Sequence, residues 1–242
     1  MPTITTENNF IWLLGALIFF LFAGAIADQL ELWNAERIIN ISLMITLVIN
    51  IWSVDDARTN IFGWKALATF VIAFTMIADS VIESNVLAKF QLILTFLFLS
   101  LTTWQAWQQV MFTGRVDQNK IVGAICIYLL LGLAWAFAYL IVEAFWPDSM
   151  NGLDFESWQR NVDDLVYYSM VTLTTLGYGD ITPDKPIARF LAYMESVTGI
   201  FYTTALVASL IGIRLSGVDA SKPIEELERE RDGLPETERD SG

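Results

Sequence analysis

The stretch that decides the fold is TLTTLGYGD, residues 172–180. Its glycines, Gly177 and Gly179, stand on either side of one tyrosine and permit backbone angles that residues with a Cβ adopt only at a cost. The preceding residues 161–174 have the pattern of a short amphipathic helix, with Asn161 as its candidate N-cap and two acids in the first turn, where the helix dipole favours them. The sequence therefore predicts a short helix that leads directly into a glycine-rich segment.

Six apolar stretches surround this segment, five before it and one after it. The hydrocarbon core of a bilayer is about 30 Å thick, and a helix needs roughly 20 mostly apolar residues to cross it. The stretches comprise residues 10–27, 38–52, 64–78, 86–107, 121–145 and 187–215. The second and third are short for a complete crossing, so they tilt little, thin the bilayer, extend into their flanks or form part of a hairpin. We expect an all-α membrane protein with six transmembrane helices.

Residues 146–186 lie between the fifth and sixth stretches and contain the glycine-rich segment. They are too polar overall to cross a membrane and too long for a simple turn. We expect the short helix and the glycine-rich segment to be re-entrant, and the function to lie in this insertion.

Composition excludes most classes of enzyme. Apolar residues make up 55% of the 242 residues, charged residues make up 17%, and the mean hydropathy is +0.49, which differs from the composition of a soluble enzyme. The chain has no histidine and one cysteine, Cys126, so His-based triads, His metal sites and intrachain disulfides are impossible. A formal net charge of −13 argues against nucleic acid as a partner. We expect no enzymatic activity and no organic cofactor.

The stretch at residues 172–180 resembles the selectivity filter of the potassium channel family, which has the form T-x-x-T-x-G-Y-G-D. The matching residues are Thr172, Thr175, Gly177, Tyr178, Gly179 and Asp180. Leu176 stands where the family more commonly has valine. The resemblance is strongest over residues 163–215, and it implies a pore helix, a filter and an inner helix, four copies of which surround one ion path. The alternative is an ordinary glycine-rich turn between two membrane helices, because a bare G-x-G is common by chance.

The resemblance also implies roles for individual residues. Backbone carbonyl oxygens of the filter would replace the hydration shell of K⁺, which is then the permeant ion. The residues expected to bind it are Thr175, Leu176, Gly177, Tyr178 and Gly179. The residues expected to support the filter are Thr174, Asp180, Tyr167, Tyr168 and Glu195. In this arrangement the side chain of Tyr178 packs outward, aided by Tyr167 and Tyr168.

The last apolar stretch carries candidates for gating or for lining the cavity, namely Gly199, Ile200, Thr203, Val207 and Ile211. Gly199 lies 19 positions after Asp180, where the resembling family carries the hinge glycine of its inner helix. A glycine inside a helix costs about 1 kcal/mol relative to alanine, so hinge bending and close helix packing are both open as reasons for it. The other four residues recur at three- and four-residue spacing and form one stripe, which faces lipid, a neighbour or, by the resemblance, the cavity.

Glu195 lies about nine residues into the same stretch, and therefore about 13 Å deep. An acidic residue inside a membrane span is a functional candidate by default. Because apolar surroundings favour the neutral form of a carboxyl group, we expect Glu195 to donate a hydrogen bond that braces the pore helix. A charged ion site is the alternative.

The fourth apolar stretch lacks the charges that a voltage sensor needs. Residues 90–112 contain no Lys or Arg, whereas the fourth helix of a voltage-gated channel carries arginines that move through the field. We expect no steep voltage dependence, and a scaffold role for the first four helices, with lipid sensing and ligand binding as alternatives. The predicted domains are a four-helix transmembrane domain resembling an uncharged voltage-sensor-like bundle (1–119), a pore domain (120–216) and an acidic cytoplasmic tail (217–242), which is solvated or forms a short tetrameric coil.

The predicted function is passive, K⁺-selective conduction by a homotetramer in a cell membrane, of the bacterial inner-membrane type. Its partners are further copies of itself and membrane lipid, and no dedicated ligand is identifiable. An even number of spans places both termini on one side, and a weak excess of Lys and Arg makes that side the cytoplasm. A non-conducting regulatory or sensor subunit and a weakly selective cation pore are the alternatives. Residues 142–184 hold eight acids, with Arg160 as their one basic residue, and would form an outer mouth that attracts cations.

Overall fold

The structure is a computed structural model that describes residues 9–30, 35–53, 61–82, 84–112, 118–155 and 157–219. This part of the chain folds into seven helices and two very short strands. In chain order they are α1 (Asn9–Gln29), α2 (Ala35–Ser53), α3 (Ile61–Ile82), α4 (Asn85–Phe112), α5 (Gln118–Phe145), β1 (Met150–Asn151), α6 (Trp158–Leu173), β2 (Thr182–Pro183) and α7 (Pro186–Asp219). The expectation of an all-helical chain is confirmed.

The helices have the length and apolar composition of a multi-pass membrane protein. Among the described residues, four stretches are long and apolar enough to cross a bilayer: Asn9–Ala27, Asn85–Val110, Ile121–Phe145 and Pro186–Ala208. Helix α3 contributes a shorter apolar stretch, Lys65–Ala78. The two shortest predicted spans therefore fall in α2 and α3, which do not reach this length and hydropathy, and the count of six crossings stays a prediction.

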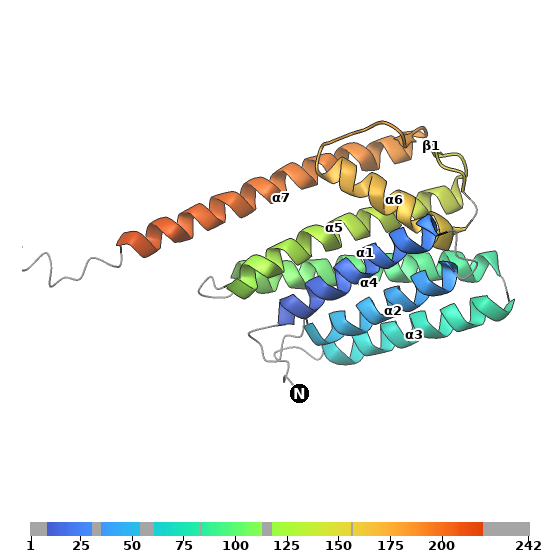
Figure 1. Cartoon of the computed structure of the whole chain (residues 1–242), viewed down its shortest axis with the longest axis horizontal. Helices are drawn as coiled ribbons and strands as arrows, with labels where there is room; N and C mark the ends of the chain where they lie inside the picture. Colours follow the sequence, from blue (N-terminus) through green and yellow to red (C-terminus); the bar gives the residue numbers. More distant parts are fainter. Residues whose placement is uncertain are drawn as a thin grey trace, which may run out of the picture. The chain divides into compact units, whose positions relative to one another are not determined.

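The first five helices form a closed ring. Each helix packs on the next in the chain, and α5 returns to pack on α1 (Figure 1). Helix α6 lies on α5 and also touches α1 and α2. In the apolar stretch of α5, 56% of the residues are buried, and the side chains of Leu133, Phe137 and Tyr139 are almost completely enclosed. Helix α5 is therefore the platform that positions α6 and the segment after it.

The chain divides into two compact units, residues 1–200 and residues 201–242. The first unit holds α1–α6, both strands and the beginning of α7. The second unit holds the rest of α7, which is described to residue 219. The predicted acidic tail lies outside the described residues from residue 220 onward, and the predicted domain boundaries stay predictions.

Helix α6 begins before its predicted start. Its N-cap is Ser157, which has an extended backbone (φ −148°) and whose Oγ accepts a hydrogen bond from the backbone N–H of Arg160. Asn161 lies inside the helix, where its side-chain amide donates to the carbonyl oxygen of Asp154 at 3.0 Å and to Asp164 at 3.3 Å. The prediction that Asn161 caps the helix with two acids in the first turn is therefore wrong, because Ser157 satisfies a free amide one turn earlier.

The strands β1 and β2 fasten the segment after α5 to the segment after the glycine-rich stretch. They pair antiparallel, with Met150 opposite Pro183 and Asn151 opposite Thr182. Next to β1, Gly152 has a φ of +78°, and a Cβ built on it would lie 2.1 Å from the carbonyl oxygen of Asp180. The two backbone segments thus approach each other as closely as only glycine allows.

Candidate functional site

The backbone of residues 175–179 alternates between positive and negative φ. Thr175, Gly177 and Gly179 have φ of +60°, +59° and +82°, whereas Leu176 and Tyr178 between them have negative φ. This alternation lets successive carbonyl groups face the same side of the segment. Glycine adopts positive φ freely, but a β-branched threonine does so only under strain, of the kind that collects at functional sites.

The carbonyl oxygens of residues 175–179 accept no hydrogen bond from the described residues. The backbone N–H groups of Thr175 and Leu176 instead donate back to the carbonyl oxygens of Thr172 and Val171, both at 2.9 Å, and so continue the end of α6. Thr174 is the C-cap of α6, and its Oγ1 donates to the carbonyl oxygen of Met170 at 2.7 Å. A row of unpaired carbonyl oxygens thus follows directly from the C-terminus of α6, where the helix dipole is negative.

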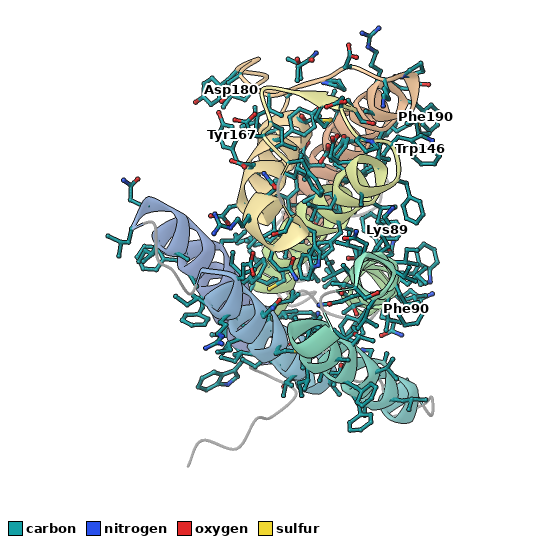
Figure 2. The ribbon with its side chains drawn as sticks, turned by 90° about the vertical axis from the view of Figure 1, so that its right-hand side faces the viewer. Lys89, Phe90, Trp146, Tyr167, Asp180 and Phe190 are labelled. Atoms are coloured by element: carbon teal, nitrogen blue, oxygen red, sulfur yellow. The ribbon has the colours of Figure 1, made fainter. Side chains whose placement is uncertain are left out.

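Tyr167 holds the far end of this row. Its hydroxyl donates to Oδ2 of Asp180 at 2.7 Å, and its ring stacks on the ring of Tyr178, with the planes 9° apart and the centroids 6.4 Å apart. Figure 2 shows Tyr167 and Asp180 close together at one end of the first unit. This hydrogen bond keeps the pKa of Asp180 below its usual range and raises the pKa of Tyr167 to about 12. Because the bond is strongest between an ionised carboxylate and a neutral phenol, and both pKa shifts favour those forms, the bond persists over a wide range of pH.

Tyr168, predicted to help Tyr178, faces the other way. It is 6% exposed and packs edge-on against Tyr139 of α5, with the ring centroids 5.0 Å apart. Neighbouring residues on a helix point about 100° apart, so Tyr167 and Tyr168 cannot serve the same neighbour. The structure therefore brings Tyr167 to Tyr178 and places Tyr168 against α5.

Glu195 lies in the contact between α5, α6 and α7. It is completely buried, and its Oε2 accepts a hydrogen bond from the hydroxyl of Tyr139 at 2.7 Å. Its Oε1 lies 2.5 Å from Oγ of Ser169, which also contacts the carbonyl oxygen of Gly132 at 2.7 Å. The carboxyl group thus contacts the helix that leads into the row of carbonyls.

Two glycines let neighbouring helices approach α6. A Cβ on Gly199 of α7 would lie 2.0 Å from the carbonyl oxygen of Leu173, and a Cβ on Gly132 of α5 would lie 2.4 Å from the Cε of Met170. Hinge bending and close packing were both open as reasons for Gly199. The contact with Leu173 supports close packing. The short distance to a backbone atom leaves no room for a larger residue.

Comparison with known proteins places the site in a family. Residues 123–214 match the family described as "Ion channel", and this range contains most of α5, all of α6, the row of carbonyls and most of α7. The chain is similar to this family over the matched segment, which is less than half of its length. The family is one of channels and not of enzymes. We call residues 123–214 the ion channel segment below.

Two curated relatives match about the same part of the chain. A voltage-gated potassium channel of Aeropyrum pernix is 33% identical over 96 residues, and two-pore potassium channel 2 of Arabidopsis thaliana is 28% identical over 95 residues. The matches cover 40% and 38% of this chain, and 29% and 18% of the two relatives. The predicted resemblance to potassium channels is confirmed, and the chain matches less than a third of the length of either relative.

Two residues of the ion channel segment that hold the loop after α5 were not predicted from the sequence. Glu143, 3% exposed near the end of α5, accepts hydrogen bonds from the backbone N–H groups of Asp148, Ser149 and Met150 at 2.7–3.1 Å. Gly152 provides the close approach to Asp180 described above. An acid in the last turn of an apolar helix was the signal for Glu143. Glu143 is one of the eight acids predicted to form the outer mouth. Because it is buried and binds backbone amides, it is not available to attract cations there.

The predicted cavity stripe is only partly described. Ile200 in the first unit and Thr203 and Val207 in the second are exposed. Ile211 belongs to α7, and its side chain lies outside the described residues. Among the described residues, no group of three or more Cys, Asp or Glu side chains could hold a metal ion.

Proposed function

We propose that the chain forms one quarter of a homotetrameric, K⁺-selective channel that conducts K⁺ passively across a membrane. The observation that carries the proposal is the row of unpaired carbonyl oxygens at residues 175–179, in an ion channel segment whose relatives are named as potassium channels. Rings of such carbonyls replace the hydration shell of K⁺ in a selective pore. K⁺ is the permeant ion and would meet the carbonyls of Thr175, Leu176, Gly177, Tyr178 and Gly179.

The elements around the row would share the remaining tasks. The C-terminus of α6, capped by Thr174, would direct the negative end of its dipole toward the ion. Tyr167 would fix the outer end of the filter by holding Tyr178 and Asp180. Tyr168 and Glu195 would hold α6 against α5 and α7 from behind.

Exposed apolar surface supports a tetramer. In one chain, the side chains of Leu176 and Tyr178 are 56% and 67% exposed. Only 17% of the residues in the apolar stretch Pro186–Ala208 of α7 are buried, compared with 56% of the residues in Ile121–Phe145 of α5. A single copy leaves the row of carbonyls open on one side, whereas fourfold symmetry encloses it. The proposed arrangement within each chain is six spans with cytoplasmic termini, in which the fourth helix carries no gating arginines.

Potassium flux into liposomes that contain only this purified protein tests the proposal. We expect K⁺ to enter much faster than Na⁺. Equal fluxes of the two ions would favour a weakly selective cation pore. The absence of any flux would favour a non-conducting regulatory or sensor subunit.

A further inference from the structure

The environment of Glu195 contains more hydrogen-bond contacts than hydroxyl protons. The carboxyl group has two neighbours, the hydroxyl of Tyr139 at Oε2 and the hydroxyl of Ser169 at Oε1. Ser169 has a second contact, with the carbonyl oxygen of Gly132. Three hydrogen bonds therefore need three protons, and the two hydroxyl groups supply two.

The missing proton can be placed. The carbonyl oxygen of Gly132 can only accept, so the single proton of Ser169 must point toward it. Oγ of Ser169 is then an acceptor for Glu195, and Oε1 of Glu195 must be the donor. Tyr139 donates its own proton to Oε2. All three contacts are satisfied together only when the carboxyl group of Glu195 is protonated.

The surroundings of Glu195 agree with this count. The side chain is 0% exposed, and it forms no ion pair with a described lysine or arginine. The titratable groups around it are the phenols of Tyr128 and Tyr139 on α5 and of Tyr168 on α6, which do not offset a negative charge. A buried and unpaired carboxylate is strongly unfavourable, whereas a neutral carboxyl group with its hydrogen bonds satisfied is not.

The contact has a second point one helical turn away. Glu195 and Gly199 lie four residues apart on α7, and they meet Ser169 and Leu173, which lie four residues apart on α6. Residues at this spacing lie on the same face of a helix. The two pairs therefore set both the distance and the register between α7 and the helix that ends at the row of carbonyls.

We infer that Glu195 carries a proton and donates it in a hydrogen bond to Ser169, as a positioning residue that holds α6 between α5 and α7. The protonation rests on the contacts alone, and its effect on conduction rests on the proposed function. An ionised Glu195 cannot donate, so Ser169 would have to leave either Gly132 or Glu195. Deprotonation therefore loosens α6, and with it the row of carbonyls.

Infrared spectroscopy of the purified full-length protein tests the proton directly and needs no ion flux. We expect the carbonyl stretch of a protonated carboxylic acid at neutral pH in the wild-type protein and its loss in Glu195→Gln. Glu36→Gln is the control, because Glu36 is half exposed and pairs with Arg160 on the surface, so its substitution should leave this band unchanged. A carboxylate band that disappears in Glu195→Gln would overturn the inference.

The pH dependence of K⁺ flux in liposomes tests the positioning role. Glu195→Gln keeps one donor and one acceptor and cannot ionise, so we expect K⁺/Na⁺ selectivity to be retained and to become insensitive to alkaline pH. In the wild-type protein, selectivity should be lost as the pH rises through the ionisation of Glu195. Equal sensitivity of both proteins would overturn the positioning role. Absence of flux in both, with the infrared band present, would refute the proposed function and leave the protonation standing.

Discussion

Gly177 shows at the level of one residue how the proposed filter depends on its backbone. Its φ is +59°, and a Cβ built on it meets no atom within 4 Å, so alanine would act through conformation alone. The left-handed conformation costs a residue with a Cβ roughly 1–2 kcal/mol, once in each chain of the proposed tetramer. We expect Gly177→Ala to abolish or greatly reduce K⁺-selective flux in liposomes.

A matched control separates the effect of backbone conformation from the effect of the added methyl group. Gly15 on α1 also has free space around its Cβ position, but its φ is not positive. Gly15→Ala should therefore leave flux and selectivity unchanged. If Gly177→Ala retains full selectivity, the filter lies elsewhere in the chain.

The bond between Tyr167 and Asp180 predicts a dependence on pH. Asp180 has its pKa lowered by this bond, so the bond's contribution is present above the usual pKa of an aspartate and is lost as pH falls through the lowered value. Tyr167 has its pKa raised to about 12, so its contribution is lost only as pH rises through that value. We expect the K⁺ selectivity of the wild-type protein to withstand acid further than that of Tyr167→Phe, measured as flux against pH on the outer side. The same acid limit in both proteins would show that the bond does not hold the filter.

At the level of elements, α6 is contacted by a glycine of α7 and a glycine of α5. Substitution of these two glycines should reduce stability by different amounts. The Cβ of Gly199→Ala would meet the backbone carbonyl of Leu173, which cannot turn away, so we expect a loss of about 1–3 kcal/mol in stability, as for an overpacked core. The Cβ of Gly132→Ala would meet the flexible end of Met170, which can move, and should cost less. Thermal unfolding of the purified proteins compares the two.

The same pair of variants decides between the two interpretations of Gly199. If Gly199 serves packing, Gly199→Ala lowers the unfolding temperature more than Gly132→Ala does. If Gly199 is a hinge, Gly199→Ala changes channel opening while its unfolding temperature stays close to that of the wild-type protein.

The sequence predicted those elements whose signal is local. The alternation of glycine with bulkier residues identifies residues 175–179, and the lone acid within an apolar helix identifies Glu195. Glu143 has the same local signal, but it was counted only among the acids of the outer mouth, and its role as an acceptor for three amides was missed. The contact of Gly152 with Asp180 joins residues far apart in the sequence and has no local signal, so it was missed as well. The cap at Ser157 was missed because Asn161 is an equally good capping residue, and only the position of a free amide distinguishes them.

At the level of the whole molecule, the absence of basic residues from the interior of α4 predicts weak voltage dependence. In α4, Lys89 lies at the beginning of the helix, over the ring of Phe145 at 4.9 Å, and no Lys or Arg follows it to Phe112. Moving one charge through the full field changes the energy by about 2.3 kcal/mol per 100 mV, and α4 offers no charge in its interior to move. We expect the open probability of the purified protein in planar bilayers to change little with voltage. A steep sigmoidal conductance–voltage curve would contradict this.

The loop held by Glu143 is expected to exchange its amide hydrogens slowly. The amides of Asp148, Ser149 and Met150 donate to Glu143, and those of Asp184 and Lys185 donate to the carbonyl oxygen of Ser149. These loop amides should exchange with deuterated water as slowly as those of helices, because exchange requires the bonds to open. Glu143→Gln, which keeps one acceptor oxygen in place of two, should speed exchange at residues 148–150. In the proposed channel, these loops form the entrance that an ion would meet first. They would nevertheless be among the parts of the surface that unfold locally most slowly.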